Sequence, residues 1–277
     1  MAKTTGPAGW PKDRPLAVCV DIMCEAWTDD SAPGIGPMGN PLKPGFEDTQ
    51  ARSWALYGMN VGAWRLLDIV KDMKVPASVY ASGMIAERWP DLVRRVLADG
   101  HHLATHAWAQ NIYPVYQKRE DEEADLVRQL AAFATLGHRP RGFASPRGTN
   151  SPNTLELLAK HGFKWTIDRF DQDTPYLEQT KAGPLAVVPF TMEVNDLPLY
   201  VRYGNVPEEY TRVLQRMLER YESIGRPPMI LDITAHAHVF GRPAGAVEFR
   251  AAIEAAKASP HVWFTTHSQL ADLVFPK

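Results

Sequence analysis

Short apolar runs alternate along the chain with stretches in which apolar residues recur every three or four positions. A short apolar run is typical of a buried strand, whereas the wider spacing is typical of an amphipathic helix. The expected strands are residues 16–22, 76–80, 102–105, 141–144, 185–189, 229–234 and 261–265. The expected helices carry the stripes Leu66, Ile69, Val70 and Met73; Leu92, Val93, Val96 and Leu97; Leu126, Val127, Leu130, Phe133 and Ala134; Leu155 and Leu158; Tyr210, Val213, Leu214, Met217 and Tyr221; and Phe249, Ala252, Ile253 and Ala256.

Proline, glycine and acidic residues indicate where several of these helices begin or end. Pro90 suits the first position of one helix, and Gly100 suits the residue just after its C-terminal cap. The acidic run 120–123 suits the first turn of the next helix, because negative charge is favourable at a helix N-terminus. Ser151 is expected to cap a further helix, with Pro152 at its first position.

The alternation continues over almost the whole chain with no linker between two halves, which favours one α/β domain. We predict an irregular (β/α) barrel over residues 16–277, and a chain of 277 residues has a usual length for one barrel. Residues 1–15 are rich in Gly, Pro and charge and are expected to form an N-terminal arm, in which Trp10 packs against the domain. Residues 29–48 predict a long loop of a kind that often carries function.

Composition and charge exclude several classes of partner. The formal net charge of -2 leaves no basic excess for a phosphate backbone, so we expect a small-molecule substrate and no nucleic acid. We also expect no membrane partner and a cytoplasmic location, because the sequence shows neither a long apolar span nor a secretory pattern. Cys19 and Cys24 are an odd number of positions apart on an expected strand, so they should face opposite sides and form no disulfide with each other.

Polar residues follow most of the expected strands. In a parallel barrel the carboxyl ends of the strands meet on one face, so acids, histidines and an arginine from distant parts of the chain should converge there. Because neighbouring side chains of a strand point to opposite sides, at most one of His236 and His238 is expected to face this site. We expect one mouth of the barrel to be lined by residues 21–27, 106–113, 144–149, 168–176, 193–196 and 236–241.

Three motifs of the chain resemble those of a known superfamily. Residues 100–108 (GHHLATHAW), 142–163 (GFASPRGTNSPNTLELLAKHGF) and 233–243 (ITAHAHVFGRP) are similar in order and spacing to the polysaccharide deacetylases, also called carbohydrate esterase family 4. Residues 17–27 and 187–196 look like the branch of that superfamily that contains allantoinases and cyclic imide hydrolases. The resemblance implies an irregular barrel and an amidohydrolase that acts on carbon–nitrogen bonds other than peptide bonds.

The chain departs from this superfamily at the positions that hold a metal ion in the deacetylases. A metal-binding aspartate is expected just after Asp21, but Met23 stands there, and Gln110 replaces the second histidine of the pair that begins with His106. Since a catalytic zinc ion usually needs three protein ligands, we predict that no metal cofactor is bound. The alternative is a zinc site rebuilt from Glu25, His106 and His236.

Without a metal ion, protein groups must activate the attacking water. The resemblance implies that Glu25 is the general base, with a pKa raised by apolar neighbours, and that His236 protonates the leaving nitrogen. His106 would orient the carbonyl or share the proton, and Asp21 stands at the position of the family's base. Five further residues are predicted to bind the substrate through carbonyl-binding groups or flat aromatic walls: Trp27, Trp108, Arg147, Tyr176 and Asn195.

The function that these residues predict is the ring opening of a small cyclic amide or imide, as in an allantoinase or an imidase. Two alternatives remain open at this point: a metal-dependent deacetylase of an N-acyl or sugar substrate, and a non-catalytic protein that binds a small molecule. A homo-oligomer is expected by analogy, because the N-terminal arm could wrap a neighbouring subunit.

Overall fold

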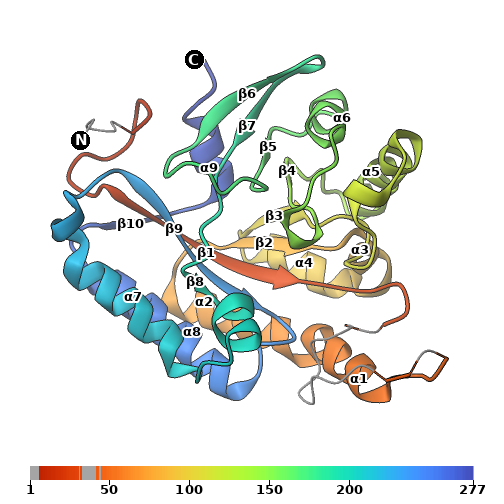
Figure 1. Cartoon of the computed structure of the whole chain (residues 1–277), viewed down its shortest axis with the longest axis horizontal. Helices are drawn as coiled ribbons and strands as arrows, with labels where there is room; N and C mark the ends of the chain where they lie inside the picture. The colour runs from red at the N-terminus through yellow and green to blue at the C-terminus, as the bar shows by residue number, and fades with distance from the viewer. Residues whose placement is uncertain (1–5, 31, 33–41, 44, 277) are drawn as a thin grey trace.

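The computed structural model describes residues 6–30, 32, 42–43 and 45–276. Figure 1 shows a mostly parallel, twisted sheet with helices packed along its outer side, which is the irregular (β/α) barrel expected from the sequence. The strands are β1 (Leu16–Cys24), β2 (Ser78–Ala81), β3 (His102–Thr105), β4 (Gly142–Phe143), β5 (Trp165–Thr166), β6 (Tyr176–Thr180), β7 (Gly183–Val187), β8 (Val194–Asn195), β9 (Met229–His236) and β10 (Val262–Thr265).

β1 lies at the centre of the sheet, whose strand order is β6-β7-β5-β4-β3-β2-β1-β9-β8. On one side β1 pairs with β9 along nearly its whole length. On the other side it pairs first with β10 and then with β2. Every pairing is parallel except the β6–β7 hairpin, so the carboxyl ends of the parallel strands gather at one end of the barrel.

The helices follow the apolar stripes of the sequence. In α2 the stripe residues Leu66, Val70 and Met73 are buried, and α4 begins at Pro90 and is followed by Gly100 with a positive φ of 76°. The α-helices are α1 (Thr49–Tyr57), α2 (Ala63–Met73), α3 (Gly83–Arg88), α4 (Pro90–Ala98), α5 (Arg119–Ala134), α6 (Thr154–Lys160), α7 (Glu208–Arg220), α8 (Pro243–Ala258) and α9 (His267–Asp272). Two π-helical segments, Gly58–Gly62 and Leu197–Arg202, interrupt this pattern.

β1 separates two apolar cores. Its residues Val18, Val20 and Ile22 face the helices and belong to the larger core, whereas Cys19 and Met23 face the barrel interior and belong to a second core. Cys24 faces the helices, and both cysteines are free, as their odd spacing predicted. The alternation of the strand therefore delivers every second residue of β1 to the inside of the barrel.

Some local predictions need correction. α6 begins at Thr154 with Asn153 at its N-cap, so Ser151 does not cap the helix. The Ser151 hydroxyl instead accepts a hydrogen bond from the backbone N–H of Asn153 and donates one to the buried carboxylate of Glu122. The sequence pattern also missed β6, which is partly exposed and has no apolar run.

The two segments predicted to lie outside regular structure are described in part. Trp10 is buried, its ring meets the Trp263 ring edge to face, and its Nε1 donates to the carbonyl oxygen of Pro15, so this part of the arm packs as expected. Residues 1–5 of the arm, and residues 31, 33–41 and 44 of the predicted loop, lie outside the described residues. In the described part of the chain, no helix is long and apolar enough to cross a membrane.

Candidate active site

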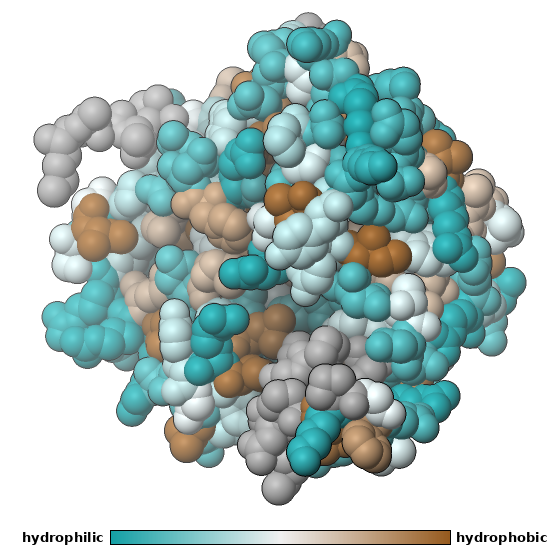
Figure 2. Space-filling view, turned by 45° about the vertical axis from the view of Figure 1, so that its right-hand side comes forward, coloured by the Kyte–Doolittle hydropathy of each residue, from teal (hydrophilic) through white to brown (hydrophobic). Residues whose placement is uncertain are grey.

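A cavity of about 830 Å³ opens at the carboxyl ends of the strands. Its floor holds Glu25, His106 and His236, which follow or end β1, β3 and β9. The π-helical segment Leu197–Arg202 supplies much of one wall, and Phe170, Phe190, Met192 and Tyr203 add apolar surface. The face of the molecule shown in Figure 2 is mostly hydrophilic with separate hydrophobic patches, and Phe170 and Tyr203 are among the large exposed apolar residues. A volume of this size suits a small organic molecule.

Glu25 lies among three histidine side chains. Its Oε1 atom is 3.4 Å from Nε2 of His106 and 3.8 Å from Nε2 of His236, and its Oε2 atom is 3.7 Å from Nδ1 of His238. The Nδ1 atom of His106 donates to the backbone oxygen of Ala144 at 3.0 Å, which leaves Nε2 as an acceptor when the ring is neutral. We call Glu25, His106, His236 and His238 the cavity cluster.

Asp196 fixes the orientation of His236. The Oδ1 atom of Asp196 is 2.6 Å from Nδ1 of His236, and Oδ2 accepts from the backbone N–H groups of His236 and Phe240. Both side chains are buried, and Asp196 is fully so. A carboxylate on Nδ1 holds the imidazole in one tautomer and turns Nε2 toward Glu25, which is the arrangement of a proton-transfer pair.

The turn that carries His236 and His238 is held by close backbone packing. A Cβ atom at Gly62 would lie only 1.9 Å from the carbonyl oxygen of Ala237, so a larger residue cannot occupy this position without moving the turn. The π-helical segment that contains Gly62 thus supports the floor of the cavity from the helix side.

Charge and burial shift the pKa values of the cavity cluster in different directions. Burial alone would raise the pKa of Glu25, but the neighbouring histidines, His236 foremost, lower it to about 2. The expectation of a raised pKa is therefore wrong, because the sequence pattern identified the apolar neighbours and not the ring of imidazoles. Burial lowers the pKa of His238 to about 4, whereas for His236 the opposing attraction of Asp196 and Glu25 outweighs burial and raises the pKa.

Asp168 supports the loop that carries Arg147. Both carboxylate oxygens of Asp168 accept hydrogen bonds from the backbone N–H of Ser145, at 2.9 and 3.1 Å. Arg147 has a positive φ of 61°, a strained conformation for a residue other than glycine, and its side chain lines the cavity. Burial raises the pKa of Asp168 to about 6 despite these hydrogen bonds.

The structure brings together only part of the predicted substrate-binding set. Arg147 and Asn195 line the cavity. Trp27 does not line it; its ring packs edge to face on His238 behind Glu25. Trp108 belongs to the core between sheet and helices and lies under the guanidinium of Arg128, and the Tyr176 hydroxyl donates to Asp171 away from the cavity.

Asp21 also lies away from the cavity. It is fully buried inside the barrel, where its Oδ1 atom is 3.3 Å from Nδ1 of His267. Met23, two residues further along the same face of β1, lines the cavity floor between Asp21 and Glu25. The position that the resemblance assigned to a base is therefore covered by the Met23 side chain.

The residues at the superfamily's metal position do not fit a metal ion. Met23 offers only a thioether, and the side-chain amide of Gln110 donates to Ser82 and to the backbone oxygen of His106. The alternative set of Glu25, His106 and His236 has both Nε2 atoms near one carboxylate oxygen, yet its ligand atoms do not all lie within 4.8 Å of one another. Ligands of a tetrahedral zinc ion would be roughly 3.3 Å apart, given bonds of about 2.0–2.1 Å.

Two residues of the site were not among the predicted catalytic set. Asp196 directly follows the predicted Asn195, but β8 is two residues long, so the sequence does not reveal that it pairs with β9. His238 was expected to face away from the site. Only His236 lines the cavity, in agreement with that expectation, but His238 follows the end of β9 in a turn and contacts the same carboxylate from the other side.

The chain is similar to several known proteins. The family model named polysaccharide deacetylase matches residues 48–166. A Schizosaccharomyces pombe protein named "Putative polysaccharide deacetylase" is 27% identical over an alignment that covers 96% of this chain and 94% of that protein. The fold is similar over nearly the full length to a probable polysaccharide deacetylase from Pseudomonas aeruginosa PAO1 (27% identical, TM-score 0.86, covering 97% of this chain and 94% of that one). It is equally similar to the Puue allantoinase (26% identical, TM-score 0.86, covering 98% and 93%).

Proposed function

We propose that this chain, which is similar to polysaccharide deacetylases and to an allantoinase, hydrolyses carbon–nitrogen bonds other than peptide bonds and opens the ring of a small cyclic amide or imide. The observation that carries the proposal is the floor of the cavity. There, Glu25 and the Asp196–His236 pair form an acid–base set, while Met23 and Gln110 stand where the superfamily's metal ligands would be. The likeness to an allantoinase, an enzyme of the same superfamily fold, supports the same reading.

The proposed reaction uses protein groups alone. The ionised Glu25 and the acceptor Nε2 of His106 hold a water molecule, whose oxygen attacks the ring carbonyl carbon. The proton lost by water passes to the Glu25–His236 pair, and His236 delivers a proton to the ring nitrogen as the C–N bond breaks. Water thus adds hydroxyl to the acyl carbon and hydrogen to nitrogen. Arg147, which also lines the cavity, stabilises the negative charge that develops on the carbonyl oxygen.

The shape of the cavity favours a small ring over a polymer chain. The lining combines polar groups, among them Glu25, His106 and His236, with apolar side chains such as Phe170, Phe190 and Leu197. A flat ring with polar edges and apolar faces matches this division, because its carbonyl and N–H groups meet the floor while its faces contact the walls.

A substrate panel tests the proposal. The purified protein is incubated with succinimide, hydantoin, dihydrouracil and allantoin, and separately with N-acetylglucosamine oligomers, and products are followed by NMR. We expect ring opening of at least one cyclic compound, abolished in Glu25→Gln, and no release of acetate. Acetate release without ring opening would contradict the proposal and favour a deacetylase. Binding of a cyclic compound without turnover would contradict it in favour of a non-catalytic binder.

A further inference from the structure

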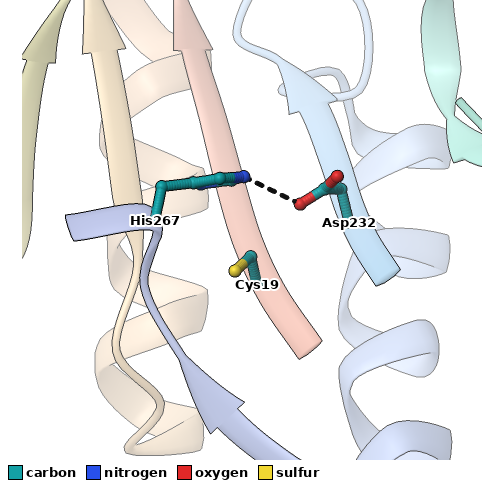
Figure 3. Close-up of side chains that lie close together, drawn as sticks. All are labelled: Cys19, Asp232 and His267. Atoms are coloured by element: carbon teal, nitrogen blue, oxygen red, sulfur yellow. Dashed lines mark ion pairs between the residues drawn. The ribbon is translucent and has the colours of Figure 1, made fainter. Parts of the chain in front are cut away.

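A second polar cluster lies inside the barrel, below the cavity floor. Figure 3 shows Cys19, Asp232 and His267, which come from β1, β9 and the start of α9; the His267 ring and the Asp232 carboxylate point toward each other, and the Cys19 side chain lies close to both. All three side chains are fully buried, with no exposed surface. A sulfur, a carboxylate oxygen and an imidazole nitrogen of these residues lie within 4.8 Å of one another. We call these three residues the interior cluster.

The backbone itself brings these residues together. In the parallel pairing of β1 with β9, Cys19 lies directly opposite Asp232. In the pairing of β1 with β10, Cys19 lies opposite Thr265, and His267 follows two residues later. The arrangement therefore depends on the register of the central strands and not on the rotamer of a single long side chain.

Two atoms of the interior cluster form an ion pair without a well-aligned hydrogen bond. The Nε2 atom of His267 is 3.1 Å from Oδ1 of Asp232 (Figure 3), and neither atom has an aligned hydrogen-bond partner. The remaining atoms of these side chains are engaged: Nδ1 of His267 bonds the hydroxyl of Ser78, and Oδ2 of Asp232 accepts from the backbone N–H and hydroxyl of Thr191. Leaving a buried nitrogen lone pair and a carboxylate oxygen face to face costs free energy unless a cation lies between them.

We propose that Cys19, Asp232 and His267 bind a zinc ion through three protein ligands inside the barrel, separate from the catalytic cavity. Thiolate, imidazole and carboxylate are the ligands that zinc takes in proteins, and the 3.1 Å between Nε2 and Oδ1 is close to the roughly 3.3 Å expected between two ligands of a tetrahedral site. Asp21 completes the surroundings: its Oδ1 atom lies 3.3 Å from Nδ1 of His267, and a carboxylate behind a ligating histidine fixes the ring and increases its affinity for metal.

A proton is the competing cation. Burial lowers the pKa of His267, but Asp21 and Asp232 outweigh it and raise the pKa to about 10, so an imidazolium between two carboxylates would also balance charge. Such an imidazolium should aim its Nε2–H at Oδ1 of Asp232, and the structure holds these atoms 3.1 Å apart as an ion pair without a well-aligned hydrogen bond. The proton and the zinc ion make different predictions about metal content.

The two cysteines provide a matched pair of variants. Cys19→Ser removes the proposed thiolate ligand, whereas Cys24→Ser changes the cysteine that faces the helices on the other side of the same strand. Each protein is unfolded, refolded with one equivalent of zinc, dialysed, and analysed for bound metal. Refolding is needed because a fully buried site takes up metal as the chain folds. We expect about one zinc per chain in the wild type and in Cys24→Ser, and less than about a tenth of that in Cys19→Ser.

Cobalt gives a second readout that does not depend on how stable the variants are. Wild-type protein refolded with cobalt(II) should show the near-ultraviolet thiolate-to-metal absorption and the visible bands of a tetrahedral ion, and so should Glu25→Gln, since the cavity lies outside the site. Zinc refolding should also raise the Tm of the wild type relative to refolding with a chelator. Wild-type protein that binds no metal, or binds cobalt without the thiolate band, would overturn the proposal and leave the proton as the cation of the interior cluster.

Discussion

The barrel holds two groups of acids and histidines at different depths along its central strands, and they differ in access to the outside. The cavity cluster surrounds Glu25 beneath an opening of about 830 Å³, whereas the interior cluster is sealed by Met23 above and by apolar side chains around it. Both contain a carboxylate within 4 Å of imidazole nitrogens. Residue type alone therefore does not identify a catalytic group; a substrate and a water molecule must also be able to approach it.

The carboxylate of the cavity cluster and the one beside the interior cluster also differ in the direction of their pKa shifts. Glu25 is held ionised, since its pKa falls to about 2 among the cavity histidines. Asp21, beside the interior cluster, has a raised pKa because burial outweighs the attraction of His267. A carboxylate that stays charged at the edge of a cavity can orient a water molecule and stabilise a protonated His236, whereas a sealed one can only affect stability.

Replacing one carboxylate in each region by its amide should give the largest difference between effects on kcat and effects on Tm. Glu25→Gln should lower kcat by at least about a hundredfold, because a general acid–base group contributes roughly that much, and should leave the Tm nearly unchanged. Asp21→Asn should change the Tm and leave kcat of the folded protein within about threefold. Steady-state kinetics and thermal unfolding of both variants measure this. A loss of kcat in Asp21→Asn as large as that in Glu25→Gln would return Asp21 to the reaction.

Asp196 should affect catalysis through His236. Asp196→Asn should lower kcat by about tenfold to a hundredfold and shift the pH profile of kcat to lower pH, because the carboxylate that raises the pKa of His236 is gone. A merely structural role would lower the amount of folded enzyme and leave the profile where it was. The double variant with His236→Ala should be no worse than His236→Ala alone, since the two residues act as one unit.

Arg147 should have a smaller effect that depends on when it contacts the carbonyl oxygen. Arg147→Ala should raise KM by about tenfold if it binds the ground state, and should lower kcat by a similar factor if its contact forms in the transition state. Arg147→Lys keeps the charge without the planar fork and should recover only part of the loss. Unchanged kcat and KM in Arg147→Ala would remove it from the site.

His238 should make the free energy of unfolding depend on pH. This effect should be confined to one pH window. Its folded pKa is lowered to about 4 from 6.5 by burial, so between these values the unfolded chain binds the extra proton and stability falls as pH falls. The groups that face it are Glu25, His236, Asp196 and Arg242. Denaturant unfolding at several pH values should show a shallower slope in His238→Gln than in the wild type; equal slopes would contradict this origin.

The sequence predicted the parts of the fold and site that depend on local pattern. Strands such as β9 and helices such as α4 follow from apolar spacing and end signals, and Glu25, His106 and His236 lie together because each follows or ends a parallel strand. The motif resemblance led to the superfamily that the comparisons support.

The parts that depend on long-range register could not be predicted. Asp196 meets His236 through a two-residue strand, and His267 meets Cys19 through the β1–β10 pairing. Two signals were nonetheless present: an aspartate in the middle of each of two buried strands, Asp21 and Asp232, and a histidine just after the last strand. Trp27 and Trp108 were misplaced because aromatic residues near a site more often pack in the core than line the cavity.

The central claim is that catalysis uses the cavity cluster and not a metal ion, whether or not zinc occupies the interior cluster. The most direct test measures kcat and bound metal on the same samples of wild type and Cys19→Ser, refolded with increasing zinc and assayed below their unfolding temperatures. We predict that kcat per folded chain is constant from almost no metal to one ion per chain. A kcat that rises in proportion to bound zinc or cobalt would contradict the account and assign the reaction to a metallohydrolase.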